Sequence, residues 1–137
     1  MTSIKTAFTR FPILTTDRLR LRQVQPSDAE ALFAIRSDPE VAYPYGQEPH
    51  KTIDDTRALI QRLQSSYDRQ ESILWCVTLK ADDRVIGSCR FSNFSSGFKC
   101  AEIGYELNRA YWRRGITAEA TSAILAYGFT ALGFHRI

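Results

Sequence analysis

The chain has 137 residues, of which 44% are hydrophobic and 24% are charged, and its formal net charge is +3 at pH 7. This length predicts one domain with a sizeable core, and the composition is that of an ordinary soluble globular protein. The mild positive charge suits an anionic ligand. No stretch approaches the roughly 20 apolar residues of a membrane span, and residues 1–13 lack the order of a signal peptide, so we expect a cytoplasmic protein.

Residues 19–36 predict a strand followed by a helix. Residues 19–24 alternate apolar and polar side chains, which is typical of a half-buried strand. Ser27 and Glu30 form a Ser-x-x-Glu capping box for a helix over residues 28–36.

A loop and a longer helix follow. Residues 38–50 are rich in proline and predict a loop with one short helical turn. Thr52 and Asp55 repeat the capping signal, which predicts a helix over residues 53–69.

The second half predicts a hairpin, a further strand and a third helix. Residues 73–80 and 85–94 are apolar runs that indicate an antiparallel hairpin, with a turn following at residues 95–97. The next strand covers residues 100–107. A helix rich in small residues then runs over residues 116–132, and Gly133 is expected to end it.

Three cysteines, Cys76, Cys89 and Cys100, are widely spaced and form no Cys-x-x-Cys pair. His50 and His135 lie too far apart in the sequence to suggest a ligand cluster. Neither a zinc site nor a disulfide framework is indicated. We therefore expect no metal, and we interpret the thiols as small core residues on strands.

The most informative segment runs from Ala101 to Ala120, from a strand through a short basic loop into a helix. Arg113, Arg114 and Gly115 stand immediately before that helix. They bring cationic side chains and unpaired backbone N–H groups to a point where the helix dipole favours an anion. The segment predicts a pyrophosphate cradle, although the basic loop alone also fits an ordinary connection with a solvated arginine pair.

Three segments, Glu102–Leu107, Ala110–Ala120 and Tyr127–Ile137, carry a family resemblance. They resemble the GNAT acetyltransferase superfamily, and within it the branch of ribosomal-protein N-terminal acetyltransferases (RimJ/RimL-like). The phosphate motif of the superfamily, Gln/Arg-x-x-Gly-x-Gly/Ala, falls on residues 112–117. Trp112 and Thr117 depart from that pattern, and Thr117 puts a β-branched side chain where the ligand backbone comes close.

The resemblance implies an α/β (α+β) GNAT fold, a mixed and mostly antiparallel sheet flanked by helices in the order β-α-α-β-β-β-α. Residues 1–137 would form a single acetyltransferase domain. In the superfamily a fifth strand begins at the equivalent of Arg136 and Ile137, and roughly 40 further residues follow. The chain therefore looks truncated near that point. Because the strand over residues 100–107 would lack a neighbour, we expect a homodimer or strand exchange through it.

Acetyl transfer to an amine needs a polarised thioester carbonyl and a base. Glu102, Gly104 and Glu106 share one face of their strand because side chains alternate. The resemblance makes Glu102 the candidate catalytic base and Glu106 the second choice. A pair of solvent-exposed glutamates on an ordinary strand is the alternative interpretation.

The resemblance also implies acetyl-CoA as co-substrate. A bulge near Leu107 and Asn108 would face the pantetheine arm. The pyrophosphate would be held by Arg113, Arg114, Gly115, Ile116, Thr117 and Ala118. Tyr43, Tyr45 and Arg90 are candidates for an acceptor pocket, while Trp75 suits an aromatic core better.

Three functions stay open at this stage. The first is an N-acetyltransferase that moves an acetyl group from acetyl-CoA to an amine, either a protein N-terminus or a small-molecule amine. The second is a non-catalytic coenzyme-A-binding remnant of such an enzyme. The third is a basic module that binds nucleic acid or the ribosome, which the scattering of 18 basic residues among 15 acidic ones disfavours.

Overall fold

The computed structural model describes residues 4–94 and 100–137, so the turn expected at residues 95–97 lies outside the described residues. Within the described residues, five strands form one antiparallel sheet in the order β1-β2-β3-β4-β5. Their bounds are Leu14–Thr15, Leu19–Arg22, Ile73–Leu79, Asp82–Ser92 and Glu102–Leu107. The predicted hairpin is confirmed, with a turn shorter than expected because β4 already starts at Asp82.

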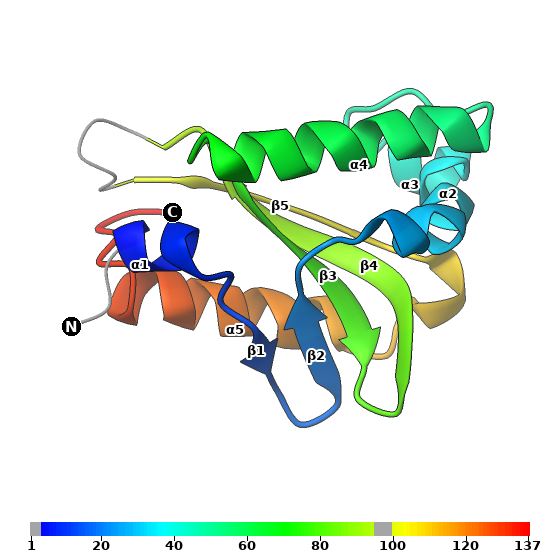
Figure 1. The fold of residues 1–137 in the computed structure, drawn as a ribbon. Coiled ribbons are helices and arrows are strands. Elements are labelled where there is room, and N and C mark those ends of the chain that lie inside the picture. The colour runs from blue at the N-terminus through cyan, green and yellow to red at the C-terminus, as the bar shows by residue number, and fades with distance from the viewer. Residues whose placement is uncertain (1–3, 95–99) are drawn as a thin grey trace.

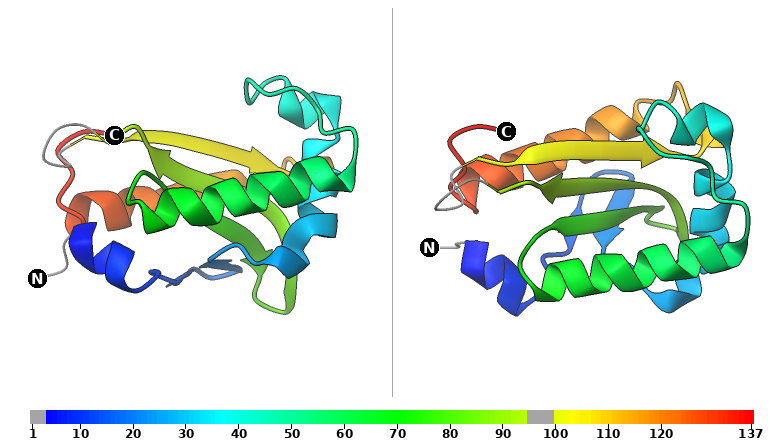
Figure 2. Two further views of the ribbon diagram at one scale, coloured as in Figure 1. Left: turned by 45° about the horizontal axis from the view of Figure 1, so that its top comes forward. Right: turned by 90° about the horizontal axis from the view of Figure 1, so that it is seen from above.

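Helices cover both faces of the sheet (Figure 1). Helices α2 and α4 pack on one face, and α5 and α1 lie on the other, as the two further views also show (Figure 2). The α-helices α1 to α5 span Ile4–Thr9, Ala29–Arg36, Pro39–Ala42, Ile53–Asp68 and Ile116–Thr130, and the 3-10 turns η1 and η3 span Pro26–Asp28 and Arg109–Tyr111. This is the expected antiparallel sheet flanked by helices, and α3 is the helical turn predicted within residues 38–50.

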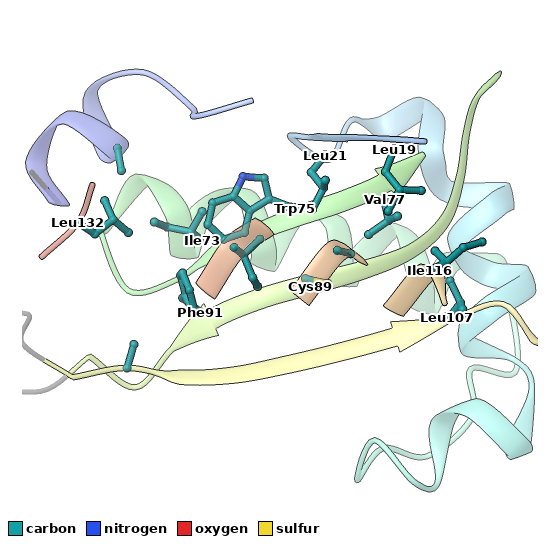
Figure 3. Packing of buried hydrophobic residues seen from close by; sticks show 14 of the residues in the cluster. Leu19, Leu21, Ile73, Trp75, Val77, Cys89, Phe91, Leu107, Ile116 and Leu132 are labelled. Carbon is teal, nitrogen blue, oxygen red and sulfur yellow. The ribbon is translucent and has the colours of Figure 1, made fainter. Parts of the chain in front are cut away.

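The main core lies between the sheet and α5 (Figure 3). Trp75 and Phe91 are fully buried there, with ring centroids 5.5 Å apart in an edge-to-face arrangement. The indole Nε1–H of Trp75 donates to the carbonyl oxygen of Pro12 at 2.7 Å. Trp75 is therefore a core residue, since its polar atom is satisfied within that layer.

Helix α5 approaches the sheet closely because it presents small residues to it. Ala120 and Gly128 are buried. A Cβ atom on Gly128 would lie 2.8 Å from Cδ1 of Ile137 and 3.0 Å from Cζ of Phe91, so even alanine would force a shift there. This tight packing holds the C-terminal end of α5 close to the sheet.

The cap predicted for the first long helix is wrong. Ser27 sits inside the 3-10 turn η1 and does not cap α2. Asp28 stands at the N-cap position of α2 but makes no side-chain cap, because its carboxylate accepts from the backbone N–H of Gln25 at 2.7 Å, in the capping box of η1, and from Arg22 at 2.9 Å. The capping box of Thr52 and Asp55 at the start of α4 is confirmed.

Cys76 on β3 and Cys89 on β4 form no disulfide, and both are buried. Burial raises the pKa of Cys76, and it raises the pKa of Cys89 to about 12. Thiols with such values are poor nucleophiles at neutral pH. Both therefore serve as packing residues.

Strand β5 lies at the edge of the sheet. Next to its start, Cys100 pairs with Arg136 in a parallel β-bridge, and the N–H of Ala101 donates to the carbonyl of Arg136 at 3.2 Å. The bridge occurs where the sequence predicted the onset of another strand. In the described part of the chain, no helix is both long and apolar enough to cross a membrane.

Candidate functional site

An open pocket of about 550 Å³ lies along β5. Its walls come from the segment after α3, from β4 and β5, and from the loop that leads into α5. Tyr45, Arg90, Glu102, Trp112 and Thr117 are among the lining residues. The pocket therefore brings Thr117 of the predicted cradle together with the predicted carboxylates and part of the predicted acceptor site, while the other cradle residues, Arg113 to Ile116 and Ala118, lie outside its lining.

The register between β4 and β5 explains how the two carboxylates reach the pocket. Glu102 pairs with Ser92, Gly104 with Arg90, and Glu106 with Ser88. Alternation along β5 thus turns Glu102 and Glu106 to the same side of the sheet, as predicted, and both line the pocket.

The two glutamates lie in different surroundings. Glu102 is exposed, and Asn93 Nδ2 donates to its Oε2 atom at 2.6 Å. Glu106 is buried, its side chain only 1% exposed. Glu102 is therefore the carboxylate that a ligand in the pocket can reach with less rearrangement.

Glu106 is already engaged within the protein. Its Oε1 atom lies 2.6 Å from Arg36 Nε, as an ion pair without a directional hydrogen bond. Ser88 Oγ donates to Oε2 at 2.6 Å. Because both oxygens of Glu106 face partners, its first role is to compensate the buried Arg36.

Two polar atoms in the wall of the pocket lack such partners. Among the described residues, the Tyr45 hydroxyl and Arg90 Nε are buried without a hydrogen bond. Burial, with a smaller contribution from the charge of Glu106, raises the pKa of Tyr45, so its hydroxyl stays protonated at neutral pH and remains a donor. Unsatisfied buried donors favour a ligand that brings an acceptor oxygen.

Tyr45 occupies this position because β5 has a glycine beneath it. A Cβ atom on Gly104 would lie 3.0 Å from the Tyr45 hydroxyl oxygen. On the other side, the Arg36 guanidinium carbon lies 5.0 Å from the centre of the Tyr45 ring. Gly104 between the two glutamates therefore makes room for the tyrosine.

The predicted cradle has the backbone shape that an anion site needs. Gly115 precedes α5 with φ of 72°, in the left-handed region that favours glycine. Within residues 4–94 and 100–137, no acceptor is recorded for the N–H groups of Ile116, Thr117 and Ala118, and the helix has no side-chain cap. These amides thus remain available to a phosphate oxygen.

The side chains around the cradle divide into two groups. Arg113 and Arg114 are exposed, whereas Ile116 is buried in the core and offers only its backbone. Thr117 lines the pocket, so its hydroxyl is placed at the junction between the cradle and β5. Trp112 fixes the loop to β5, because its Nε1–H donates to the carbonyl of Leu107 at 2.9 Å.

Two expected contacts differ in the structure. Leu107 lines the pocket, but Asn108 does not: its N–H donates to Ile86 O at 2.7 Å and its side chain caps η3. The bulge expected here is absent from the β4–β5 pairing, which keeps one register through Leu107. Tyr43 is 59% exposed and lies outside the pocket lining, unlike Tyr45 and Arg90.

Several site residues were missed from the sequence. Arg36 compensates Glu106 from α2, while Thr16 and Arg18 contact the start of α5 from the turn between β1 and β2. Their partners lie far away in the sequence, so no local pattern signals them. For Arg36, the local signal in the sequence is its place on the buried face at the end of an amphipathic helix.

The chain matches the family model described as an acetyltransferase (GNAT) domain over residues 18–137. It is 40% identical over 127 residues to YoaA of Bacillus subtilis, itself an uncharacterised N-acetyltransferase, covering 93% of this chain and 72% of that protein. A GNAT-family acetyltransferase from Bacillus anthracis has a similar structure, with a TM-score of 0.75, 27% identity, and coverage of 90% and 70%. The fold also resembles that of the Microcin C7 self-immunity acetyltransferase MccE, solved in complex with acetyl-CoA and AMP, with a TM-score of 0.68, 20% identity, and coverage of 85% and 67%.

Proposed function

The chain belongs to the GNAT acetyltransferase family and is an acetyltransferase, and from that premise we propose that it moves an acetyl group from acetyl-CoA to the nitrogen of an amine. The observation that carries the proposal is the single pocket that connects Thr117 of the cradle to Glu102 on β5. A donor with an anionic end and a reactive end fits a pocket that reaches the start of α5 at Thr117 and a carboxylate at Glu102.

The free amides at the start of α5 fit the pyrophosphate of coenzyme A. Three N–H groups and the positive end of the helix dipole favour an anion, and the exposed Arg113 and Arg114 add charge. Gly115 and Ile116 contribute backbone, while Thr117 and Leu107 line the path towards β5. For Asn108 we propose an indirect part, since its polar groups hold the turn after β5.

In the proposed reaction, Glu102 removes a proton from the acceptor ammonium group. The freed nitrogen lone pair then forms a bond to the acetyl carbon and the bond from that carbon to sulfur breaks, while the nitrogen loses a second proton and the sulfur takes up one, so that an amide forms and coenzyme A leaves as the thiol. Glu102 is preferred as the base because it is exposed in the pocket and only its Oε2 atom has a partner within the described residues, Asn93.

We propose that Tyr45 and Arg90 orient the acceptor. Their buried donor groups lack a hydrogen-bond partner, so they suit a substrate with an oxygen atom close to its amine, as in an aminoacyl group, that accepts a hydrogen bond. Glu102 in the same pocket attracts the ammonium group. A protein N-terminus and a small amine that carries a carbonyl both meet this requirement. Tyr43 would contact only a larger acceptor, because it lies outside the pocket lining.

Calorimetry with acetyl-CoA, followed by measurement of thiol release with a panel of amines, tests the proposal. We expect binding and amine-dependent release. Binding without turnover on any amine would favour the non-catalytic remnant, and no binding at high micromolar acetyl-CoA would refute both. The nucleic-acid alternative receives no support from a pocket that contains Glu40, Glu102 and Glu106.

Substituting Gly104 by alanine is expected to raise the KM for the amine by about tenfold, since one methyl group displaces the Tyr45 hydroxyl. The affinity for acetyl-CoA should stay unchanged. Steady-state kinetics in both substrates check this expectation. Gly46→Ala is not a suitable control, because the φ of Gly46 is 82° and alanine would strain the backbone there. Ala34→Gly, on the exposed side of α2, is a better control. An unchanged KM for the amine in Gly104→Ala would place the acceptor elsewhere.

We further propose that residues 1–137 act as one domain of the RimJ/RimL-like branch in the cytoplasm, and that two copies associate through the edge strand β5. The edge position of β5 supports the association, because an edge strand carries unpaired backbone groups. Sedimentation velocity at micromolar concentration should show a dimer. A single monomeric species would contradict this part without affecting the proposed chemistry.

A further inference from the structure

A group of side chains that the proposed reaction does not use lies beside the loop before α5. It joins the turn between β1 and β2 to the first turn of the helix. Thr16 Oγ1 donates to the Glu119 carboxylate. Arg18 donates to the same carboxylate twice, from its backbone N at 3.0 Å and from Nε at 2.7 Å. We refer to Thr16, Arg18 and Glu119 as the Arg18 clamp.

The clamp also holds the cradle loop itself. Arg18 Nη1 donates to the carbonyl oxygen of Arg114 at 2.9 Å. Its Nη2 lies 3.6 Å from the position that a Cβ atom on Gly115 would take. The Arg18 guanidinium therefore contacts the loop directly before Gly115, the residue with the left-handed backbone. It holds the peptide that joins Arg114 to Gly115, and the free amides of α5 come directly after it.

The charge of Glu119 makes this contact relevant to an anionic ligand. Glu119 lies in the first turn of α5, where a carboxylate favours the helix but opposes a phosphate bound at the same end. The hydrogen bond from Thr16, followed by the bonds from Arg18, lowers the pKa of Glu119 to about 2, so it stays ionised at working pH. Protonation therefore does not remove the negative charge of Glu119 beside the cradle, and a neighbouring cation has to offset it.

Arg18 is the cation in contact with it. The Arg18 side chain is 46% exposed and that of Glu119 is 21% exposed, so solvent partly screens the pair. The hydrogen bonds that lower the pKa of Glu119 also favour the folded state, because they hold the start of α5 to the turn between β1 and β2. The same contact cancels a charge at the mouth of the proposed anion site, and this second effect bears on ligand binding.

We propose that Arg18 is a positioning residue for the diphosphate of the acyl donor: it offsets the charge of Glu119 and holds the Arg114 carbonyl, so that the amides of α5 can receive the anion. This inference rests on the proposed function, because it concerns how acetyl-CoA is bound. Arg18 itself acts through the loop and through Glu119, without a contact to the reacting atoms.

Calorimetric titration with coenzyme A at low salt tests the clamp. Arg18→Ala should bind about tenfold more weakly than the unsubstituted protein, which corresponds to about 1.4 kcal/mol. The loss should shrink as salt screens the partly exposed carboxylate of Glu119. Arg18→Lys keeps the charge and should lose less affinity than Arg18→Ala.

A second substitution separates charge from folding. Adding Glu119→Gln to Arg18→Ala should restore most of the lost affinity, since the repulsive charge is then gone. A merely structural arginine predicts the opposite, because the double variant would have lost even more of the contact. Thermal melting of each variant checks that it is folded.

Arg57→Ala serves as the control, since it removes another solvent-exposed arginine from a salt bridge, the one with Asp54 on α4, away from the cradle. It should bind coenzyme A like the unsubstituted protein. If Arg18→Ala binds equally well, or if Glu119→Gln restores nothing, the clamp proposal is wrong. If the unsubstituted protein itself does not bind coenzyme A, the proposed function fails first.

Discussion

Replacing Glu102 by glutamine is expected to lower kcat by about 10²–10⁴-fold while leaving the affinity for acetyl-CoA unchanged. Glutamine keeps the size of the side chain, and its carbonyl oxygen can still accept from Asn93 Nδ2, which now lies 2.6 Å from Glu102 Oε2. It cannot take up the proton of an ammonium group. The substitution thus removes the proposed base with little other change in the pocket.

The measurement pairs thiol release with calorimetry on the same preparation. Glu30→Gln is the matched control, because Glu30 is an exposed glutamate on α2 outside the pocket lining. Its kcat should stay within about a factor of two, as is usual for surface substitutions. Full activity of Glu102→Gln would show that another group accepts the proton, or that the amine enters already deprotonated.

The fold was predictable wherever neighbouring residues decide it. Thr52 and Asp55 mark the start of α4 because both partners of the capping box lie within one turn. The cap of α2 could not be read in this way. Asp28 stands at the N-cap position without a side-chain hydrogen bond to the helix, since its carboxylate accepts from Arg22 on β2 and from the backbone N–H of Gln25.

The candidate site was predictable to the same extent. The shared face of Glu102 and Glu106 follows from alternation along one strand, and the left-handed Gly115 follows from its place before a helix. The difference between the two glutamates does not follow, because Arg36 and Ser88 approach Glu106 from α2 and β4. The Arg18 clamp could not be predicted for the same reason, since Arg18 and Glu119 are 101 positions apart in the sequence.

Replacing Glu106 by glutamine is expected to lower the free energy of unfolding by about 3–5 kcal/mol, because it leaves Arg36 buried without its counter-charge. The side chains of this pair are only 5% and 1% exposed, so water cannot take over the lost interaction. Urea denaturation measures the change. Glu71→Gln is the matched control, since it breaks the exposed pair with Arg69 and should cost at most about 1 kcal/mol.

The double variant Arg36→Met/Glu106→Leu tests whether the loss comes from the unpaired charge. Removing both charges should recover much of the stability, because apolar residues of similar size avoid the desolvation of two ions. The recovery should be incomplete, since the Ser88 hydroxyl loses its acceptor and a buried unsatisfied hydroxyl costs about 1–3 kcal/mol.

The single variant Glu106→Gln also shows which of the two glutamates is the base. If Glu106 is mainly structural, Glu106→Gln loses stability, and turnover per folded molecule falls far less than in Glu102→Gln. If Glu106→Gln instead keeps normal stability and loses turnover, Arg36 does not depend on it and the roles are exchanged. The comparison is informative because both side chains line one pocket on one face of β5 and differ in their burial and in their partners.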